Sequence, residues 1–345
     1  MIYMNHTNLI IGKLNTYKTT GVLFPEVSKA IKNGENLFIL DNKEEYYRTF
    51  QEELDHNHYT TYVFHLEDAY HSHSFNPLMT PYQYYQEGKK DKATEMVKNI
   101  ALELFQGDNV NSDPFWSNTA SNYFTALALI LFKEAKKPEV NLGSIQIMIS
   151  QSDQLKTYFD QLDVLDPIYI SGSATVYAPP ETKASIISVL RQKLNDFCVR
   201  EQLFQNLLGN EICLNQLKEK CAIFFIGNEK VNCLGNILID QLVEVSLDHH
   251  VPFTFFLDDF CDMPALLAFE KMLQKKVNMF VTTRYPEELE EKYGKLIMGK
   301  FERCINSVDV VEKDNVMKFG NCHEYPKAKE HKGTYFSVEK LVSRS

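Results

Sequence analysis

Short apolar runs alternate with helical patterns over the first 66 residues, and this alternation restricts the fold more than any other feature. Residues 22–31 and 43–54 carry apolar side chains at helical spacing, and Asn33-Gly34 is a typical end for the first helix. The runs of strand length around them are 8–11, 37–40 and 62–66. Parallel strands need a crossover of helix length between them, so this order predicts an α/β fold with a parallel sheet.

The alternation stops in the middle of the chain. Between residues 81 and 182 no strand-like run occurs, and apolar residues follow helical spacing in 93–105 and 115–133. Strand-like runs return at 222–226, 253–257 and 278–282. We therefore predict one doubly wound, mainly parallel sheet domain formed by residues 1–80 and 183–345. An all-α domain, residues 81–182, is inserted into it.

Composition narrows the class of protein. The 345 residues are 44% hydrophobic and 24% charged, as in ordinary globular proteins. The formal net charge of −10 argues against binding DNA over the whole surface, so any DNA contact has to come from a local patch or an oligomer channel. The seven cysteines form no Cys-x-x-Cys pair, and the sequence has neither a signal peptide nor an apolar run of membrane-spanning length. We expect a cytoplasmic protein without a membrane span of its own.

A phosphate-binding loop is predicted where the first strand meets the first helix. Gly12 follows the strand and Lys18-Thr19 opens the helix, in the pattern Gly-x₅-Lys-Thr. Backbone N–H groups at such a helix start face the β- and γ-phosphates, with Lys18 placed to reach them and Thr19 to bind Mg²⁺. The residues assigned to nucleotide binding are Gly12, Asn15, Tyr17, Lys18, Thr19 and Thr20.

Tyr17 stands where the full loop pattern has a second glycine. Glycine suits that position because the loop wraps closely round the phosphate and needs unusual φ angles. A bulky residue held at positive φ costs about 1–2 kcal/mol if the loop keeps its shape. A coincidental turn is the alternative interpretation of this motif.

Two adjacent carboxylates end the strand at 253–257. In a nucleotide site, Asp258 holds the Mg²⁺ shell and Asp259 polarises the attacking water. Asp259 is one methylene shorter than the glutamate usual there, and a solvated acidic turn is the alternative interpretation. Because strands of a parallel sheet end at one edge, we expect Lys18 and Asp258 to meet there.

Five short motifs occur in the order in which a known family has them. They are Leu40-Asp41-Asn42-Lys43-Glu44-Glu45, Phe75-Asn76-Pro77-Leu78, Asp113-Pro114-Phe115-Trp116, Phe256-Leu257-Asp258-Asp259-Phe260 and Tyr293-Gly294. In these motifs the chain resembles the coupling proteins of type IV secretion and bacterial conjugation, the TraG/TraD-like DNA-transfer ATPases. The resemblance implies a RecA-like P-loop NTPase domain with an all-α insertion. It also implies a homo-hexamer that uses ATP to move DNA or protein to a secretion channel.

The chain departs from this family pattern in its site residues and at its start. Asn15 and Tyr17 replace loop glycines, and Asp259 replaces the catalytic glutamate. Arg284 occupies the position of the glutamine that senses the γ-phosphate in the family, and Glu288 occupies the position of a second glutamine. The sequence begins at the first strand of the sheet, so the membrane helices of the family are not expected in it.

Three hypotheses follow. In the first, the chain is an Mg-ATP-driven coupling protein in which Asp259 and Arg284 are catalytic and Thr19 and Asp258 hold Mg²⁺. Its partners are type IV secretion and relaxosome proteins and single-stranded DNA, and a partner attaches it to the membrane periphery. In the second, it is a non-hydrolysing scaffold or recruitment subunit that keeps the fold. In the third, it is a decaying fragment of a mobile element.

Overall fold

A seven-stranded parallel sheet forms the centre of one of two compact units. The computed structural model describes residues 6–13, 16–105, 113–217, 219–227, 233–306 and 325–342. The strands are β1 (Thr7–Ile11), β2 (Asn36–Leu40), β3 (Thr60–His65), β4 (Cys221–Ile226), β5 (Phe253–Leu257), β6 (Met279–Thr283) and β7 (Arg303–Asn306). Their order in the sheet is β3-β4-β2-β5-β6-β1-β7, and their pairings are parallel.

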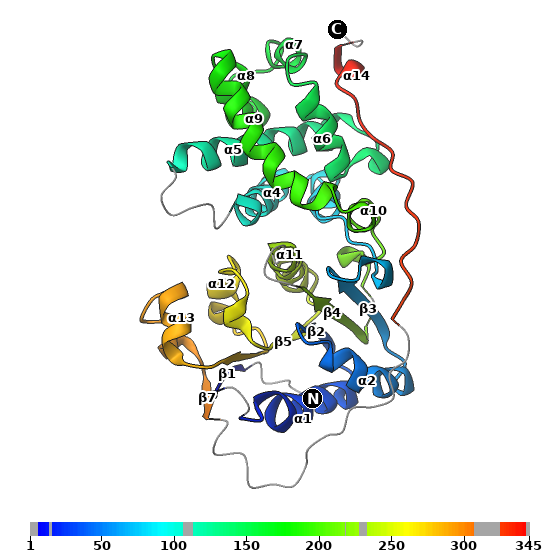
Figure 1. The fold of residues 1–345 in the computed structure, drawn as a ribbon, viewed down its shortest axis with the longest axis vertical. Helices are drawn as coiled ribbons and strands as arrows, with labels where there is room; N and C mark the ends of the chain where they lie inside the picture. Colours follow the sequence, from blue (N-terminus) through cyan, green and yellow to red (C-terminus); the bar gives the residue numbers. More distant parts are fainter. Residues whose placement is uncertain are drawn as a thin grey trace. The chain divides into compact units, whose positions relative to one another are not determined.

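Helices cover both faces of this sheet. The unit comprises Met1–His73 and Leu214–Lys327, and we call it the sheet unit. Its helices are α1 (Phe24–Asn33), α2 (Glu45–His56), α11 (Cys233–His249), α12 (Phe269–Gln274) and α13 (Pro286–Tyr293). Figure 1 shows α1 and α2 on one face, with α11 and α12 on the other. The predicted doubly wound α/β architecture is thus confirmed.

The central strands are almost entirely apolar because helices bury them from both sides. All residues of β2 and of β4 are buried. The sequence did not predict β7, which pairs with β1 at one edge of the sheet. This strand has four residues and begins with Arg303, so it lacks the continuous apolar run that marks the central strands.

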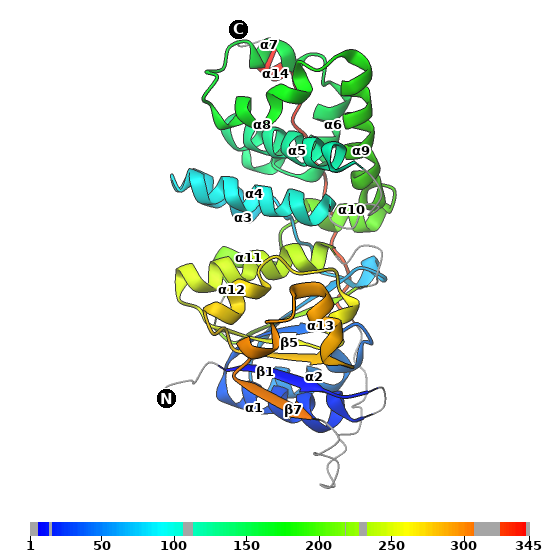
Figure 2. The same ribbon diagram turned by 90° about the vertical axis from the view of Figure 1, so that its left-hand side faces the viewer.

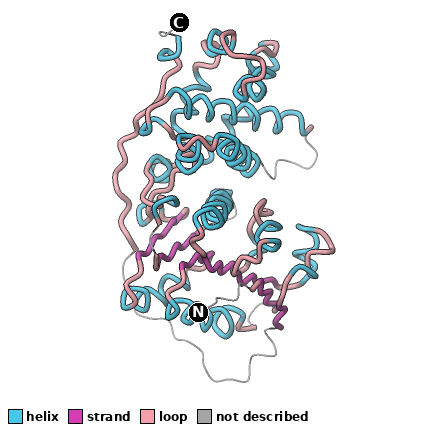
Figure 3. The backbone as a smooth tube through the Cα atoms, turned by 180° about the vertical axis from the view of Figure 1, so that it is seen from behind, coloured by secondary structure: helices cyan, strands magenta, loops and turns pink. Residues whose placement is uncertain are grey.

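The second unit consists of helices, and Figure 3 shows strands only in the sheet unit among the described residues. It comprises Ser74–Cys213 and Ala328–Ser345, and we call it the helical unit. Its helices are α3 (Met79–Gln86), α4 (Lys90–Phe105), α5 (Pro114–Glu134), α6 (Leu142–Ser150), α7 (Leu155–Phe159), α8 (Pro167–Val176), α9 (Pro180–Cys198), α10 (Glu201–Leu208) and α14 (Glu339–Val342).

Helix α5 is the centre of the helical unit and packs against α4, α8 and α9 (Figure 2). Asp113 caps its N-terminus, because the Asp113 carboxylate accepts the Phe115 N–H at 2.9 Å. Proline occupies the first helical position. Twelve residues from Ala120 to Phe132 are buried, so the helix is apolar on nearly all sides, as expected for a helix enclosed by others.

The limits of the helical unit differ from the inserted domain expected at 81–182. Helix α9 continues across residue 182 and packs against α5, so it stays with the helices. The C-terminal segment also packs there. The Phe336 N–H donates to Ser144 Oγ at 2.9 Å, and Asn141 Nδ2 donates to the Thr334 carbonyl at 2.9 Å. Phe336 is fully enclosed, and a polar sequence such as this tail gives no sign of that contact.

None of the helices in the described residues combines the length and low polarity that crossing a bilayer requires.

Asp41 joins the end of β2 to the start of α2. Its Oδ1 accepts the Glu45 N–H at 2.8 Å and the Tyr46 N–H at 3.1 Å, and its Oδ2 accepts the Tyr47 N–H at 2.8 Å. These are donors that a helix N-terminus otherwise leaves unpaired. The buried carboxylate therefore fixes where α2 begins, and with it the positions of Lys43 and Tyr46.

Asp41→Ala should lower the free energy of unfolding by about 2–3 kcal/mol, because it leaves three N–H groups without an acceptor. Asp113→Ala is the matched control, since it removes an exposed cap with one such bond, and should cost about 1 kcal/mol. Urea unfolding followed by circular dichroism measures both. Equal losses would mean that Asp41 is an ordinary cap.

Candidate nucleotide site

The predicted phosphate loop lies between β1, which ends at Ile11, and a short helix that begins at Lys18. The Gly12 N–H donates to the Thr283 carbonyl at 3.1 Å, which ties the start of the loop to β6. Residues Lys18–Leu23 form a short π-helix that continues directly into α1. Asn15 lies outside the described residues, so its assignment to nucleotide binding stays a prediction.

Tyr17 adopts the backbone conformation that glycine would take without strain. Its φ is 58° and its ψ is 21°, in the left-handed region, and its carbonyl accepts the Gly21 N–H at 2.7 Å. The side chain is 52% exposed. The strain expected from a bulky residue at positive φ is therefore present in this loop.

The structure brings the two predicted motifs together at one edge of the sheet. Thr19 Oγ1 donates to Asp258 Oδ2 at 2.7 Å, although 239 residues separate them in sequence. Lys18 is 7% exposed, and its Nζ donates to the Gly12 carbonyl at 2.7 Å and lies 3.9 Å from Asp259 Oδ1. Lys18, Thr19 and both carboxylates thus share one site.

Asp258 is held by four hydrogen bonds. Besides Thr19, its Oδ2 accepts the Tyr46 hydroxyl at 2.9 Å. Its Oδ1 accepts the Thr282 hydroxyl at 2.7 Å and the Asp259 N–H at 3.0 Å. Burial and the Asp258 charge raise the pKa of Tyr46 well above its usual value, so this phenol stays a neutral donor.

Sequence reasoning missed Tyr46 and Thr282. Tyr46 lies on the apolar face of α2, where a tyrosine is expected to belong to the core. The local sequence therefore did not distinguish it from other core residues. Thr282 lies near the end of β6, at the edge where ligands bind, and that position was a usable signal.

Asp259 also has a left-handed backbone, with a φ of 45° and a ψ of 42°. Its carboxylate lies between two lysines, because Oδ2 is 2.5 Å from Lys43 Nζ and Oδ1 faces Lys18. Lys43 was missed as a site residue. It belongs to the stretch after β2 that carries the family resemblance, and its place at a strand end could have marked it.

These residues line a cavity of about 380 Å³, a size suited to a small ligand. Its lining is polar and rich in lysine, which favours an anion. The lining residues are Lys13, Thr16, Tyr17, Lys18, Thr19, Thr20, Lys43, Glu45 and Asp259. Of the predicted site residues, Gly12 and Asp258 contact this lining through hydrogen bonds to Lys18 and Thr19.

The oxygen ligands available in this site fit an Mg²⁺ ion that binds together with a nucleotide. Thr19 and Asp258 offer a hydroxyl and a carboxylate 2.7 Å apart, and Mg²⁺ prefers such oxygen ligands. Across the part of the chain that the structure describes, no group of three or more His, Cys, Asp or Glu side chains could hold a metal ion. An ion here would need phosphate oxygens and water to complete its shell.

Arg284 lies away from the cavity lining. Its Nε donates to Glu288 Oε1 at 2.8 Å, and its Nη2 donates to Asp262 Oδ1 at 2.8 Å. The hydrogen bond that Arg284 donates to Glu288 and the charge of Asp262 raise the pKa of Arg284. Neither of these bonds reaches Lys18 or Asp259, although the Asp259 charge also acts to raise the Arg284 pKa, and the catalytic assignment of Arg284 stays a prediction.

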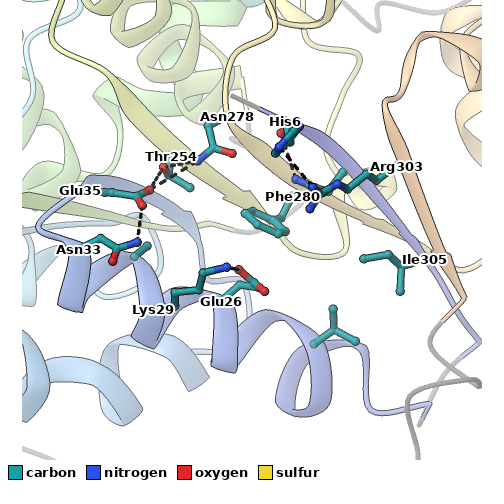
Figure 4. A pocket seen from close by; sticks show the side chains of 13 residues that line it. His6, Glu26, Lys29, Asn33, Glu35, Thr254, Asn278, Phe280, Arg303 and Ile305 are labelled. Atoms are coloured by element: carbon teal, nitrogen blue, oxygen red, sulfur yellow. Dashed lines mark hydrogen bonds and ion pairs between the residues drawn. The ribbon is translucent and has the colours of Figure 1, made fainter. Parts of the chain in front are cut away.

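A second cavity, of about 320 Å³, lies at the opposite ends of the strands (Figure 4). Several of its charged and polar side chains form hydrogen bonds with one another. Lys29 Nζ donates to Glu26 at 3.2 Å, and Glu35 accepts Asn33 Nδ2 at 3.1 Å and the Thr254 hydroxyl at 2.5 Å. None of the residues predicted for the nucleotide site lines it.

Comparison with solved structures shows the fold. The chain is similar to the bacterial conjugative coupling protein TrwB in complex with sulphate, with a TM-score of 0.60 and 12% identity over 96% of this chain and 86% of that one. TrwB with a non-hydrolysable ATP analogue gives 0.58 and 11% over the same shares. VirB4 of Thermoanaerobacter pseudethanolicus gives 0.50 and 10% over 97% and 90%. The predicted RecA-like α/β fold with an all-α insertion is confirmed.

A search of curated protein sequences finds no match to the chain. A family model does match, and it covers most of the chain, including the phosphate loop, the helical insertion and the acidic pair. Its description is Type IV secretory system Conjugative DNA transfer, and the match runs over residues 5–279. The protein therefore belongs to the conjugative DNA-transfer family of type IV secretion, the family that its five motifs resemble.

Proposed function

We propose that the protein is a coupling-type ATPase that binds Mg-ATP in the 380 Å³ cavity and recruits and drives DNA or protein substrates to a type IV secretion channel. The observation that carries this proposal is the meeting of Lys18 and Thr19 with Asp258 and Asp259 in one site. A lysine, a hydroxyl and two carboxylates at the end of parallel strands are the groups that phosphoryl transfer requires.

Each group has a defined role in this proposal. Lys18 binds the β- and γ-phosphates, and the start of the helix directs N–H groups at them. Thr19 and Asp258 hold Mg²⁺, which neutralises charge on the phosphates when it is bound. Tyr46 and Thr282 keep the Asp258 carboxylate in place. Asp259 orients the attacking water and accepts its proton.

The similar TrwB structures include complexes with an ATP analogue and with ADP and Mg²⁺, which supports the choice of nucleotide and ion. The family supports partners among conjugation and secretion proteins. We further propose a homo-hexamer, as the family resemblance implies, in which Arg284 acts at the nucleotide site of a neighbouring subunit. Single-stranded DNA then passes through the oligomer channel, and a partner brings the complex to the membrane.

A non-hydrolysing scaffold is the second candidate. Both Tyr17 and Asp259 have strained backbones, and both oxygens of Asp259 face lysines instead of open solvent. With a lysine at each oxygen, this carboxylate is not positioned to orient a water molecule. Such a protein would bind Mg-ATP without turning it over.

Calorimetric titration of the wild-type protein with Mg-ATP, together with a phosphate-release assay, tests the proposal. We expect binding in the micromolar range, loss of binding when EDTA removes Mg²⁺, and hydrolysis that single-stranded DNA stimulates. Binding without phosphate release, with or without DNA, identifies the scaffold. An absence of binding contradicts the ATPase and leaves a scaffold that keeps only the fold, or a decaying fragment.

A further inference from the structure

Lys43 is a second lysine at the acidic pair, supplied by a different part of the sheet. It follows the end of β2, and its Nζ lies 2.5 Å from Asp259 Oδ2. Its side chain is 53% exposed and lines the 380 Å³ cavity together with Lys18. The two ammonium groups therefore face the two oxygens of one carboxylate from separate elements.

The strand order puts these lysines on opposite sides of the acidic pair. Strand β2 pairs with β5, β5 with β6, and β6 with β1. The loop after β1 carries Lys18, the loop after β5 carries Asp259, and the loop after β2 carries Lys43. A polyphosphate chain bound by the predicted phosphate loop would extend through this cavity from β1 towards Asp259. The phosphate that approaches Lys43 is therefore the terminal one.

The side chain of Lys43 is positively charged at neutral pH. Burial lowers its pKa, but the hydrogen bond and charge of Asp259, with the charge of Asp258, outweigh burial and raise the pKa overall. The ammonium is thus protonated at neutral pH, and its flexible stem lets it exchange one anionic partner for another. A γ-phosphate carries more negative charge than a single carboxylate and competes well for it.

We propose that Lys43 recognises the γ-phosphate of a bound nucleoside triphosphate and, in binding it, releases the carboxylate of Asp259. In the nucleotide-free protein Lys43 is paired with Asp259. When a triphosphate binds, its γ-phosphate replaces Asp259 as the partner of the Lys43 ammonium. A diphosphate is too short to reach this ammonium and leaves the ion pair between Lys43 and Asp259 intact. The inference rests on the proposed nucleotide site, and it makes Lys43 the residue that distinguishes ATP from ADP.

Lys43→Ala tests this by calorimetric titration with two probes, a Mg-bound non-hydrolysable ATP analogue and Mg-ADP. We expect the affinity for the ATP analogue to fall at least tenfold and the affinity for ADP to change less than threefold. Lys29→Ala is the matched control, because Lys29 is also an exposed lysine paired with a carboxylate, Glu26, but lies at the other cavity (Figure 4). It should change neither affinity.

Loss of Lys43 also uncovers the charge of Asp259, which by itself repels phosphate. Repeating the comparison in an Asp259→Asn background separates the two causes. A direct contact with the γ-phosphate keeps the selective loss in that background, whereas simple repulsion by Asp259 makes it disappear and overturns the inference.

Equal losses for the two probes, or no loss, would also overturn the role of Lys43, while wild-type binding leaves the proposed function standing. If the wild-type protein binds neither probe, the proposed function and this inference both fail. Unchanged unfolding midpoints for the variants show that the fold is intact.

Discussion

Lys18→Ala is expected to weaken Mg-ATP binding by at least about 3 kcal/mol, or roughly 100-fold in Kd, and to reduce ATP hydrolysis to background. The Nζ of Lys18 is buried beside the cavity, where a charge-assisted bond to phosphate is stronger than at the surface. In the nucleotide-free protein it already points at the site, through its bonds to Gly12 and Asp259. Calorimetry and phosphate release measure the two effects.

Lys13 supplies the control for that experiment. It is an exposed lysine in the same loop and lines the same cavity, so Lys13→Ala removes the same charge from the site without removing a buried contact. We expect a change in Kd of less than about fivefold, because exposed charges interact weakly through water. Similar losses for the two variants would mean that the loop attracts nucleotide by overall charge and does not bind it as a P-loop.

Phe24→Ala is expected to lower the free energy of unfolding by about 3–5 kcal/mol. Phe24 is the first residue of α1, directly after the short helix of Lys18, and is fully buried. Its ring makes edge-on contacts with Tyr46, at a centroid distance of 5.0 Å, and with Phe50, at 5.2 Å. Removing it leaves a cavity between α1 and α2 at the base of the nucleotide site.

Urea unfolding followed by circular dichroism measures the loss, with Phe115→Ala as the control. Phe115 is 49% exposed in the helical unit, so its truncation should cost less than about 1 kcal/mol. Phe24→Leu should recover most of the stability. Because Tyr46 binds Asp258, we also expect Phe24→Ala to weaken Mg-ATP binding. A stability loss as small as that of Phe115→Ala would contradict this packing.

Among the described residues, three other than glycine have a left-handed backbone in the loops beside the candidate site. Tyr17, Glu44 and Asp259 all have positive φ, and each lies in a loop after a strand at the cavity edge, those of β1, β2 and β5. Each costs of order 1 kcal/mol or more without glycine. Backbone strain of this kind persists where many surrounding contacts hold the chain in place. Here the hydrogen bonds of Asp258 and the helix cap formed by Asp41 hold the neighbouring loops.

Much of the architecture could be predicted from local pattern. The apolar runs of β2, β4 and β5 were recognisable because both of their faces are buried. The end of α1 was recognisable because Gly34 adopts a φ of 75°, which favours glycine. The limits of the two units could not be predicted in this way. Helix α9 and the C-terminal segment belong with the helices through contacts that no local pattern encodes.

The amino-acid sequence was enough to predict the alternation of strands and helices, the family, and the four groups Lys18, Thr19, Asp258 and Asp259. Those follow from residue type and short spacing, which act over a few residues of chain. The convergence of Tyr46, Thr282 and Lys43 on the acidic pair became visible only in the folded chain. They come from α2, β6 and the loop after β2, and the order of parallel strands, which spacing along the chain does not record, brings them to one edge.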